Sequence, residues 1–273
     1  MRVHQRFFWH RATFFCLLFA IAGISCSRSS RTQKALEERA KTIGAPPSVL
    51  RIPSTNEMSG QGPFRSAKWF TLIWQERRLY AWERRQSDKG AVVFVGDSII
   101  HGWVGLERAF LNLQSANRGI SGDTTRGVLY RFDEDVLQLQ PSAVVLLCGI
   151  NDLSDGATTE QVVQNIQSLI RLSQNTDSNM PVIICTVLPV GSDNQVVNRL
   201  VRELNDKLKL LVGEKTNVFV ADSWSALANT DGVAQSDDFP DLTHPNESGY
   251  AKLGKCLQPI LERITNQREG LVP

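Results

Sequence analysis

The fold of this chain is decided by the stretch AVVFVGDS at residues 91–98. Its first five residues form a continuous apolar run, which is typical of a parallel strand covered by helices on both faces. A glycine and two polar residues follow at once, so the chain turns sharply where the strand ends. Open α/β sheets bind ligands beyond the carboxyl ends of their strands, and Ser98 would lie at such an end.

Further short apolar runs are predicted strands, and amphipathic segments separate them. Strands that alternate with helices indicate a parallel sheet between two layers of helices. We therefore predict an α/β protein with three α/β/α layers and a flavodoxin-like sheet of five parallel strands in the order 2-1-3-4-5. The later strands are predicted at residues 115–118, 143–148, 182–188 and 218–221. Helices are predicted at 64–86, 124–139, 158–174, 195–212 and 246–264, and a further helical stretch follows the first strand to about residue 113.

The amino-terminal region has the pattern of an export signal. Arg2, Arg6 and Arg11 precede an uncharged run rich in Phe, Leu and Ile, as in a secretory signal peptide. The apolar run is shorter than the roughly 20 residues of a membrane span, and a retained short anchor is the alternative. The predicted segments are a signal peptide at 1–26, a linker at 27–63, one domain at 64–266 and a tail at 267–273.

Cys26 follows the apolar run and resembles the cleavage site of a bacterial lipoprotein. Such sites usually carry Leu three residues before the Cys, and Gly23 stands there in this chain. A lipidated Cys26 would tether the protein to a membrane, whereas cleavage nearby would release it, as a periplasmic or secreted protein. Both outcomes stay open. The polar, basic segment with Pro46-Pro47 has the composition of a spacer, which favours the tether.

Charge and cysteine content exclude several functions. Without the leader, 27 of the 30 Lys and Arg remain against 28 Asp and Glu, so the domain carries no basic patch that predicts a nucleic-acid partner. Cys148 and Cys185 fall in apolar strand-like runs and are predicted to be buried thiols. Together with Cys256 they show neither metal spacing nor a disulfide framework, so we expect no metal and no cofactor. The sequence carries no signal for an oligomeric state.

The residues at the strand ends supply the parts of a serine esterase. A serine hydroxyl needs an adjacent base to take its proton, and Ser98 is the candidate nucleophile. Of the four histidines, His4 and His10 lie in the leader, which leaves His101 and His244. By itself, the Gly-Asp-Ser turn at Ser98 favours a structural role, because these are common turn residues.

His244 is the better candidate for the base because Asp241 precedes it by three residues. A carboxylate at that position can hold the imidazole in the required tautomer and stabilise the imidazolium. The structural alternative for Asp241 is a cap near a helix start. Asp237 and Asp238 are nearby candidates for the same catalytic role. His101 has no obvious orienting partner and would be a surface or pocket-lining residue.

Acyl transfer also needs donors for the oxyanion, each of which lowers the barrier by about 3 kcal/mol. The candidates are the backbone N–H groups of Ser98 and Gly122 and the side-chain amide of Asn151. Taken singly, Gly122 is equally a loop glycine and Asn151 an Asx turn or a cap. Their joint occurrence, in order and at strand ends, favours the catalytic interpretation.

These motifs resemble the SGNH hydrolase superfamily, also called the GDSL esterases, over about residues 64–264. Residues 119–126 (GISGDTTR) are most similar to the platelet-activating-factor acetylhydrolase subunit group. The first block departs from the family in having Ile99 where Leu is usual. The four blocks that carry the resemblance are residues 95–98, 117–123, 149–152 and 241–244.

The resemblance implies a metal-free serine hydrolase with Ser98 as nucleophile and His244 as base. We expect an exported esterase that acts on a small ester with a short acyl group, such as an acetylated sugar or a lipid-like ester. A lysophospholipase or thioesterase is the alternative enzyme, and a lipoprotein that only binds glycans or a partner is the alternative outside catalysis. Trp103 and Phe110 would line an acyl pocket or, more in keeping with their size, belong to the core.

Overall fold

The protein is described by a computed structural model over residues 26–212 and 217–269. The predicted signal peptide, apart from Cys26, and the last four residues of the predicted tail lie outside the described residues. Within the described part, no helix has both the length and the apolar character needed to cross a membrane.

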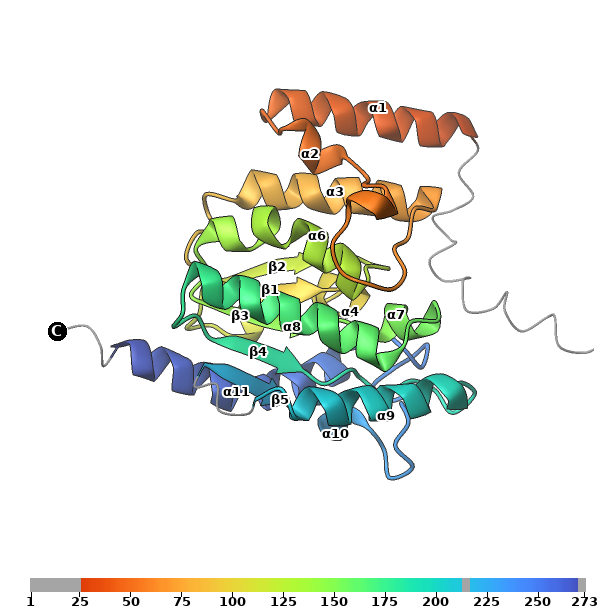
Figure 1. Ribbon diagram of the computed structural model, residues 1–273, viewed down its shortest axis with the longest axis vertical. Helices are drawn as coiled ribbons and strands as arrows, with labels where there is room; N and C mark the ends of the chain where they lie inside the picture. The colour runs from red at the N-terminus through yellow and green to blue at the C-terminus, as the bar shows by residue number, and fades with distance from the viewer. Residues whose placement is uncertain (1–25, 213–216, 270–273) are drawn as a thin grey trace, which may run out of the picture.

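Five parallel strands form one sheet in the order β2-β1-β3-β4-β5, which confirms the predicted α/β fold and strand order. The three inner strands, β1, β3 and β4, are buried along their whole length because helices cover both faces of the sheet (Figure 1). The strands are β1 Val92–Gly96, β2 Ser115–Gly119, β3 Ala143–Leu147, β4 Val182–Cys185 and β5 Val218–Ala221. The predicted fourth strand, 182–188, thus ends three residues early.

Alternate residues of β1 enter two different cores. Val93 and Val95 pack in the core beneath α6 (Thr125–Asp135), α8 (Thr159–Thr176) and α9 (Gln195–Lys209). Phe94 packs on the opposite face with residues of α4 (Ser98–His101) and α11 (Glu247–Glu269). This two-sided burial explains why the strand has no polar alternation. The short helices at the strand ends are α7 Ile150–Ser154 and α10 Ser223–Leu227.

The predicted continuous helix up to about residue 113 is wrong. The chain instead forms α4 and the separate short helix α5 (Leu106–Ala109). Gly102 ends α4, and a Cβ at this position would lie 2.9 Å from the Tyr250 hydroxyl of α11. Two glycines, Gly102 and Gly105, also weaken helix formation in this stretch. Trp103 and Phe110 lie in the core, as their size suggested.

Residues 27–63, predicted to be a linker, include apolar side chains that pack against the rest of the protein. Leu36 and Ala40 of α1 (Cys26–Thr42) are buried with Val49 against Leu79 of the long helix α3. Figure 1 shows α1 as the outermost helix, lying along α3. Few apolar residues form this contact, so the composition of the segment still looks like that of a spacer. The remaining helices here are α2 Pro47–Leu50, the 3₁₀ turn η2 Thr55–Glu57 and α3 Lys68–Arg84.

Candidate active site

Ser98 begins helix α4 directly beyond the end of β1. The side chain of Asp97 caps this helix by accepting the Ile99 N–H at 2.9 Å. Only glycine fits at position 96, since a Cβ there would lie 1.9 Å from the carbonyl oxygen of Leu147 in β3. The close packing of β1 against β3 and the Asp97 cap together hold the Ser98 hydroxyl at the carboxyl edge of the sheet.

The loop before α11 brings a histidine and a carboxylate to this hydroxyl. His244 Nε2 lies 2.9 Å from Ser98 Oγ, and His244 Nδ1 lies 2.7 Å from Asp241 Oδ2. Asp241 Oδ1 accepts the backbone N–H groups of Thr243 at 3.0 Å and His244 at 2.7 Å. Burial disfavours the charged carboxylate, but these hydrogen bonds outweigh it and lower the pKa of Asp241. The carboxylate is therefore ionised at neutral pH.

Leu242 gives this loop its shape. Its φ of 60° lies in the left-handed region, which is costly for a residue with a branched side chain. The turn is held by hydrogen bonds from the Leu242 N–H to Phe239 O and from the Gly191 N–H to Leu242 O, both 2.9 Å. The competing carboxylate Asp238 instead accepts hydrogen bonds from Ser248 and Lys252.

Gly122 and Asn151 lie beside one another at the ends of β2 and β3. Asn151 Nδ2 donates to the carbonyl oxygen of Asp123 at 2.8 Å, so one amide hydrogen remains for another acceptor. Gly122 has a φ of 85°, and a Cβ at this position would lie 2.7 Å from the ring of Trp69. The predicted Ser98, His244 and Asp241 thus form one hydrogen-bonded series, Asn151 contacts the residue that follows Gly122, and no larger residue fits at position 122.

One residue next to these groups has no counterpart in the sequence prediction. Arg65 Nη1 donates to Asn151 Oδ1 at 3.0 Å and to the carbonyl oxygen of Gly122 at 3.2 Å. Arg65 also pairs with Asp155. A lone arginine at the start of the helix predicted at 64–86 carries no recognisable pattern, so only the tertiary structure reveals it.

His101 has a different role from that of a base. Its Nδ1 accepts the Ser121 N–H at 3.2 Å and lies 2.7 Å from Ser121 Oγ. Burial, aided by the charge of Arg77, lowers the pKa of His101 to about 4. A neutral imidazole therefore holds the loop that follows β2.

Three buried carboxyl groups lie beneath the site. Burial raises the pKa of Asp97 and of Asp152 to about 7 and that of Asp123 to about 6. Asp152 accepts the Thr125 N–H at 2.9 Å, and Asp123 pairs with Arg131 at 2.9 Å. The Asp152 contact joins α7, which carries Asn151, to the start of α6, three residues after Gly122.

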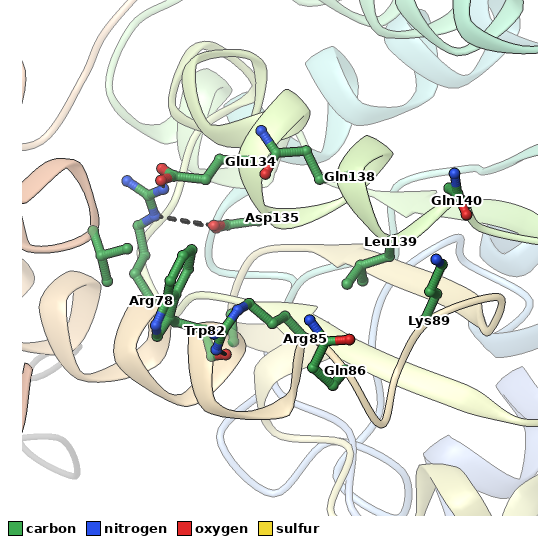
Figure 2. Close-up of a pocket in the computed structure, with 12 residues that line it drawn as sticks. Arg78, Trp82, Arg85, Gln86, Lys89, Glu134, Asp135, Gln138, Leu139 and Gln140 are labelled. Carbon is green, nitrogen blue, oxygen red and sulfur yellow. Dashed lines mark hydrogen bonds and ion pairs between the residues drawn. The ribbon is translucent and has the colours of Figure 1, made fainter. Parts of the chain in front are cut away.

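A separate cavity has different chemistry. It has a volume of about 270 Å³ and lies between α3, α6 and the 3₁₀ turn η3 (Leu137–Leu139). Figure 2 shows Arg78 paired with Asp135 at its wall, and the lining contains no serine, cysteine or histidine. Within the described residues, no group of three or more His, Cys, Asp or Glu side chains could hold a metal ion. Among the described residues, the candidate active site is therefore the one around Ser98.

The chain belongs to the GDSL-like lipase/acylhydrolase family, whose sequence model matches residues 94–252, more than half of the chain. This confirms the predicted family, and the protein is accordingly a hydrolase of the esterase type. The match includes Ser98, Gly122, Asn151 and His244, whereas Arg65 lies outside it.

Sequence relatives and solved structures agree with this membership. The platelet-activating factor acetylhydrolase IB subunit alpha2 of Homo sapiens is 28% identical over 180 residues, which cover 64% of this chain and 78% of the relative. The alpha1 subunit of Bos taurus is 27% identical over 183 residues, which cover 66% and 78%.

Two solved structures share the fold. A GDSL-like lipase from Bacteroides thetaiotaomicron has a TM-score of 0.60 and 24% identity, covering 68% of this chain and 97% of its own. A member of the lipolytic protein G-D-S-L family from Veillonella parvula has a TM-score of 0.55 and 26% identity, covering 63% and 98%.

Proposed function

We propose that the protein is an exported serine esterase that removes small acyl groups from carboxylic esters. The observation that carries the proposal is the continuous hydrogen-bonded series from Ser98 Oγ through the two ring nitrogens of His244 to Asp241. This is the geometry that a serine nucleophile needs, because the base contacts the hydroxyl and is itself oriented by a carboxylate.

In the proposed reaction, Ser98 Oγ attacks the acyl carbonyl carbon while His244 Nε2 takes the hydroxyl proton. Asp241 stabilises the imidazolium that forms. The backbone N–H groups of Ser98 and Gly122 and the free amide hydrogen of Asn151 donate to the oxyanion. His244 then gives its proton to the leaving alcohol. Water attacks the acyl-serine with His244 as base, which releases the acid and restores Ser98.

The preference for small acyl groups has one support. The relatives described above are named acetylhydrolases. An acetylated sugar or a lipid-like acetate is the proposed substrate class. A lysophospholipase or thioesterase would instead favour long acyl chains.

Export is proposed from the signal-peptide pattern of residues 1–26. We further propose that lipidation of Cys26 tethers the protein to a membrane, for which the small residues before it are the support. Mass spectrometry of the mature amino terminus tests both points. An intact leader on the purified protein argues against export, and an unmodified cysteine argues against the tether.

Labelling with a fluorophosphonate tests the reaction type. We expect one modified residue, Ser98, and hydrolysis of aryl esters that decreases from acetate to longer chains. Ser98→Ala and His244→Ala should each abolish labelling and hydrolysis. Ser178→Ala is the matched control, because this exposed serine precedes β4 at the opposite edge of the sheet. Hydrolysis that persists in Ser98→Ala would overturn the proposal.

A further inference from the structure

Arg65 connects the segment before α3 to the candidate oxyanion hole. Its guanidinium makes a two-pronged ion pair with Asp155, with N–O distances of 2.6 and 2.9 Å. The remaining nitrogen, Nη1, contacts Asn151 Oδ1 and the carbonyl oxygen of Gly122. The guanidinium also lies 5.9 Å from the centre of the Trp69 ring, which fills the space beside Gly122. Every nitrogen of this side chain therefore has a partner at or beside the hole.

We propose that Arg65 is a positioning residue, which holds Asn151 and Gly122 in the orientation that stabilises the oxyanion. The proposal rests on the proposed function above. It assigns a role in positioning the oxyanion donors to the segment before α3, which lies outside residues 94–252, the part matched by the family model.

The hydrogen bonds of Asn151 show how the positioning works. An asparagine amide can be turned by half a rotation, which exchanges its oxygen and its nitrogen. Arg65 only donates, so it selects the orientation with Oδ1 facing the guanidinium. The carbonyl oxygen of Asp123 only accepts, so it selects Nδ2 on the other side. The two contacts leave the second Nδ2 hydrogen free for the substrate.

The planar shape of the guanidinium matters more than its charge. Asp155 neutralises much of the positive charge, since the two groups form a bidentate pair with both side chains partly buried. A lysine ammonium cannot reach Asp155 through two parallel hydrogen bonds while also contacting Asn151 and Gly122. We therefore expect Arg65→Lys to resemble Arg65→Gln in its effect on turnover.

Arg126 offers a matched control for a merely structural role. Its guanidinium also ties the amino-terminal segment to the domain, through the carbonyl oxygens of Thr55, Met58 and Gly62. None of these contacts involves Asn151. A residue that only anchors the segment should behave like Arg126.

The experiment compares Arg65→Gln with Arg126→Gln in the full-length protein, using an aryl acetate. Loss of one oxyanion donor lowers kcat about 10²- to 10³-fold, so a misaligned donor in Arg65→Gln should lower kcat about 10- to 100-fold with KM within about threefold. Arg126→Gln should lower the melting temperature and leave kcat unchanged. In an Asn151→Ala background, Arg65→Gln should cause little further loss, because the group that it positions is absent.

The proposal is overturned if Arg65→Gln changes only the melting temperature, or if its effect on kcat multiplies fully with that of Asn151→Ala. Restored turnover of Arg65→Ala with added guanidinium chloride at non-denaturing concentration would support it further. Ser98→Ala distinguishes a failure of the positioning role from a failure of the proposed function. An inactive Ser98→Ala together with an unaffected Arg65→Gln refutes the positioning role alone, whereas an active Ser98→Ala refutes the proposed function.

Discussion

Removing the charge of Asp241 tests the role of the carboxylate with little change in shape. In Asp241→Asn, one side-chain oxygen can still accept the backbone N–H groups of Thr243 and His244. The amide NH₂ then replaces the oxygen that faces His244 Nδ1. Because an NH₂ group donates, it favours the imidazole tautomer with its proton on Nε2. That tautomer cannot accept the proton of Ser98.

The size of the effect follows from two contributions. A hydrogen bond to a charged group contributes about 1.5–3 kcal/mol, or about 10- to 150-fold in rate. The wrong tautomer adds to this, and the corresponding change in a serine protease triad lowers kcat about 10⁴-fold. His244 and Asp241 are 38% and 40% exposed, so solvent screens part of the charge. We therefore expect a loss of about 10³-fold in kcat for Asp241→Asn.

The assay is the steady-state hydrolysis of an aryl acetate at neutral pH, with the melting temperature as a check on folding. Asp237→Asn is the matched control, since this exposed neighbour competes with Asp241 in the sequence and should retain full turnover. If Asp241→Asn keeps kcat within about threefold of the wild type, the carboxylate does not orient the base. A large loss in both variants would point to the loop as a whole and not to the carboxylate.

Three further predictions concern the hole, the amino-terminal helix and pH. Gly122→Ala should lower kcat at least about 100-fold, measured on an aryl acetate, because its Cβ would lie 2.7 Å from Trp69 at a φ of 85°. Leu36→Ala should lower the free energy of unfolding by about 2 kcal/mol in urea titrations, because it opens the contact with Leu79. Asp97 has a folded pKa of about 7 against an ordinary value of 3.8, so its contribution to stability is present below about pH 4 and lost as pH rises through 7. Urea titrations at pH 5 and pH 8 give the free energy of unfolding of Asp97→Asn and of the wild type. The difference in favour of the variant should be larger at pH 8, and an equal difference at the two pH values would contradict this.

The sheet is predictable from sequence because its burial leaves a direct trace. The five residues before Gly96 are apolar without alternation, and the same holds for β3, so both faces must be covered. The helix up to about residue 113 is mispredicted partly for a reason outside its own sequence. Gly102 lies against Tyr250, about 150 positions away along the chain, and this contact ends α4.

The residues that sequence reasoning missed depend on contacts between distant segments. Leu36 and Ala40 are two apolar residues in a polar helix, and their burial depends on Leu79 of α3. The role proposed for Arg65 follows only from its contacts with Asn151 and Asp155, which lie about 90 residues further along the chain. The candidate nucleophile, base and oxyanion donors could be proposed from the sequence because each lies in a recognisable block.

The buried carboxyl groups show how the site gains rigidity at the expense of stability. Burial raises the pKa of Asp152 to about 7 and that of Asp123 to about 6, so the ionisation of either group lowers the stability of the folded protein at neutral pH relative to acid pH. An apolar residue at either position would avoid this cost but leave the N–H of Thr125 or the guanidinium of Arg131 without its buried partner. The Asp152 hydrogen bond holds the start of α6, after β2, against α7, which follows β3, and the Asp123 pair holds the loop after β2 against α6. Since oxyanion donors act only when held in place before the charge develops, this rigidity is what the proposed reaction requires.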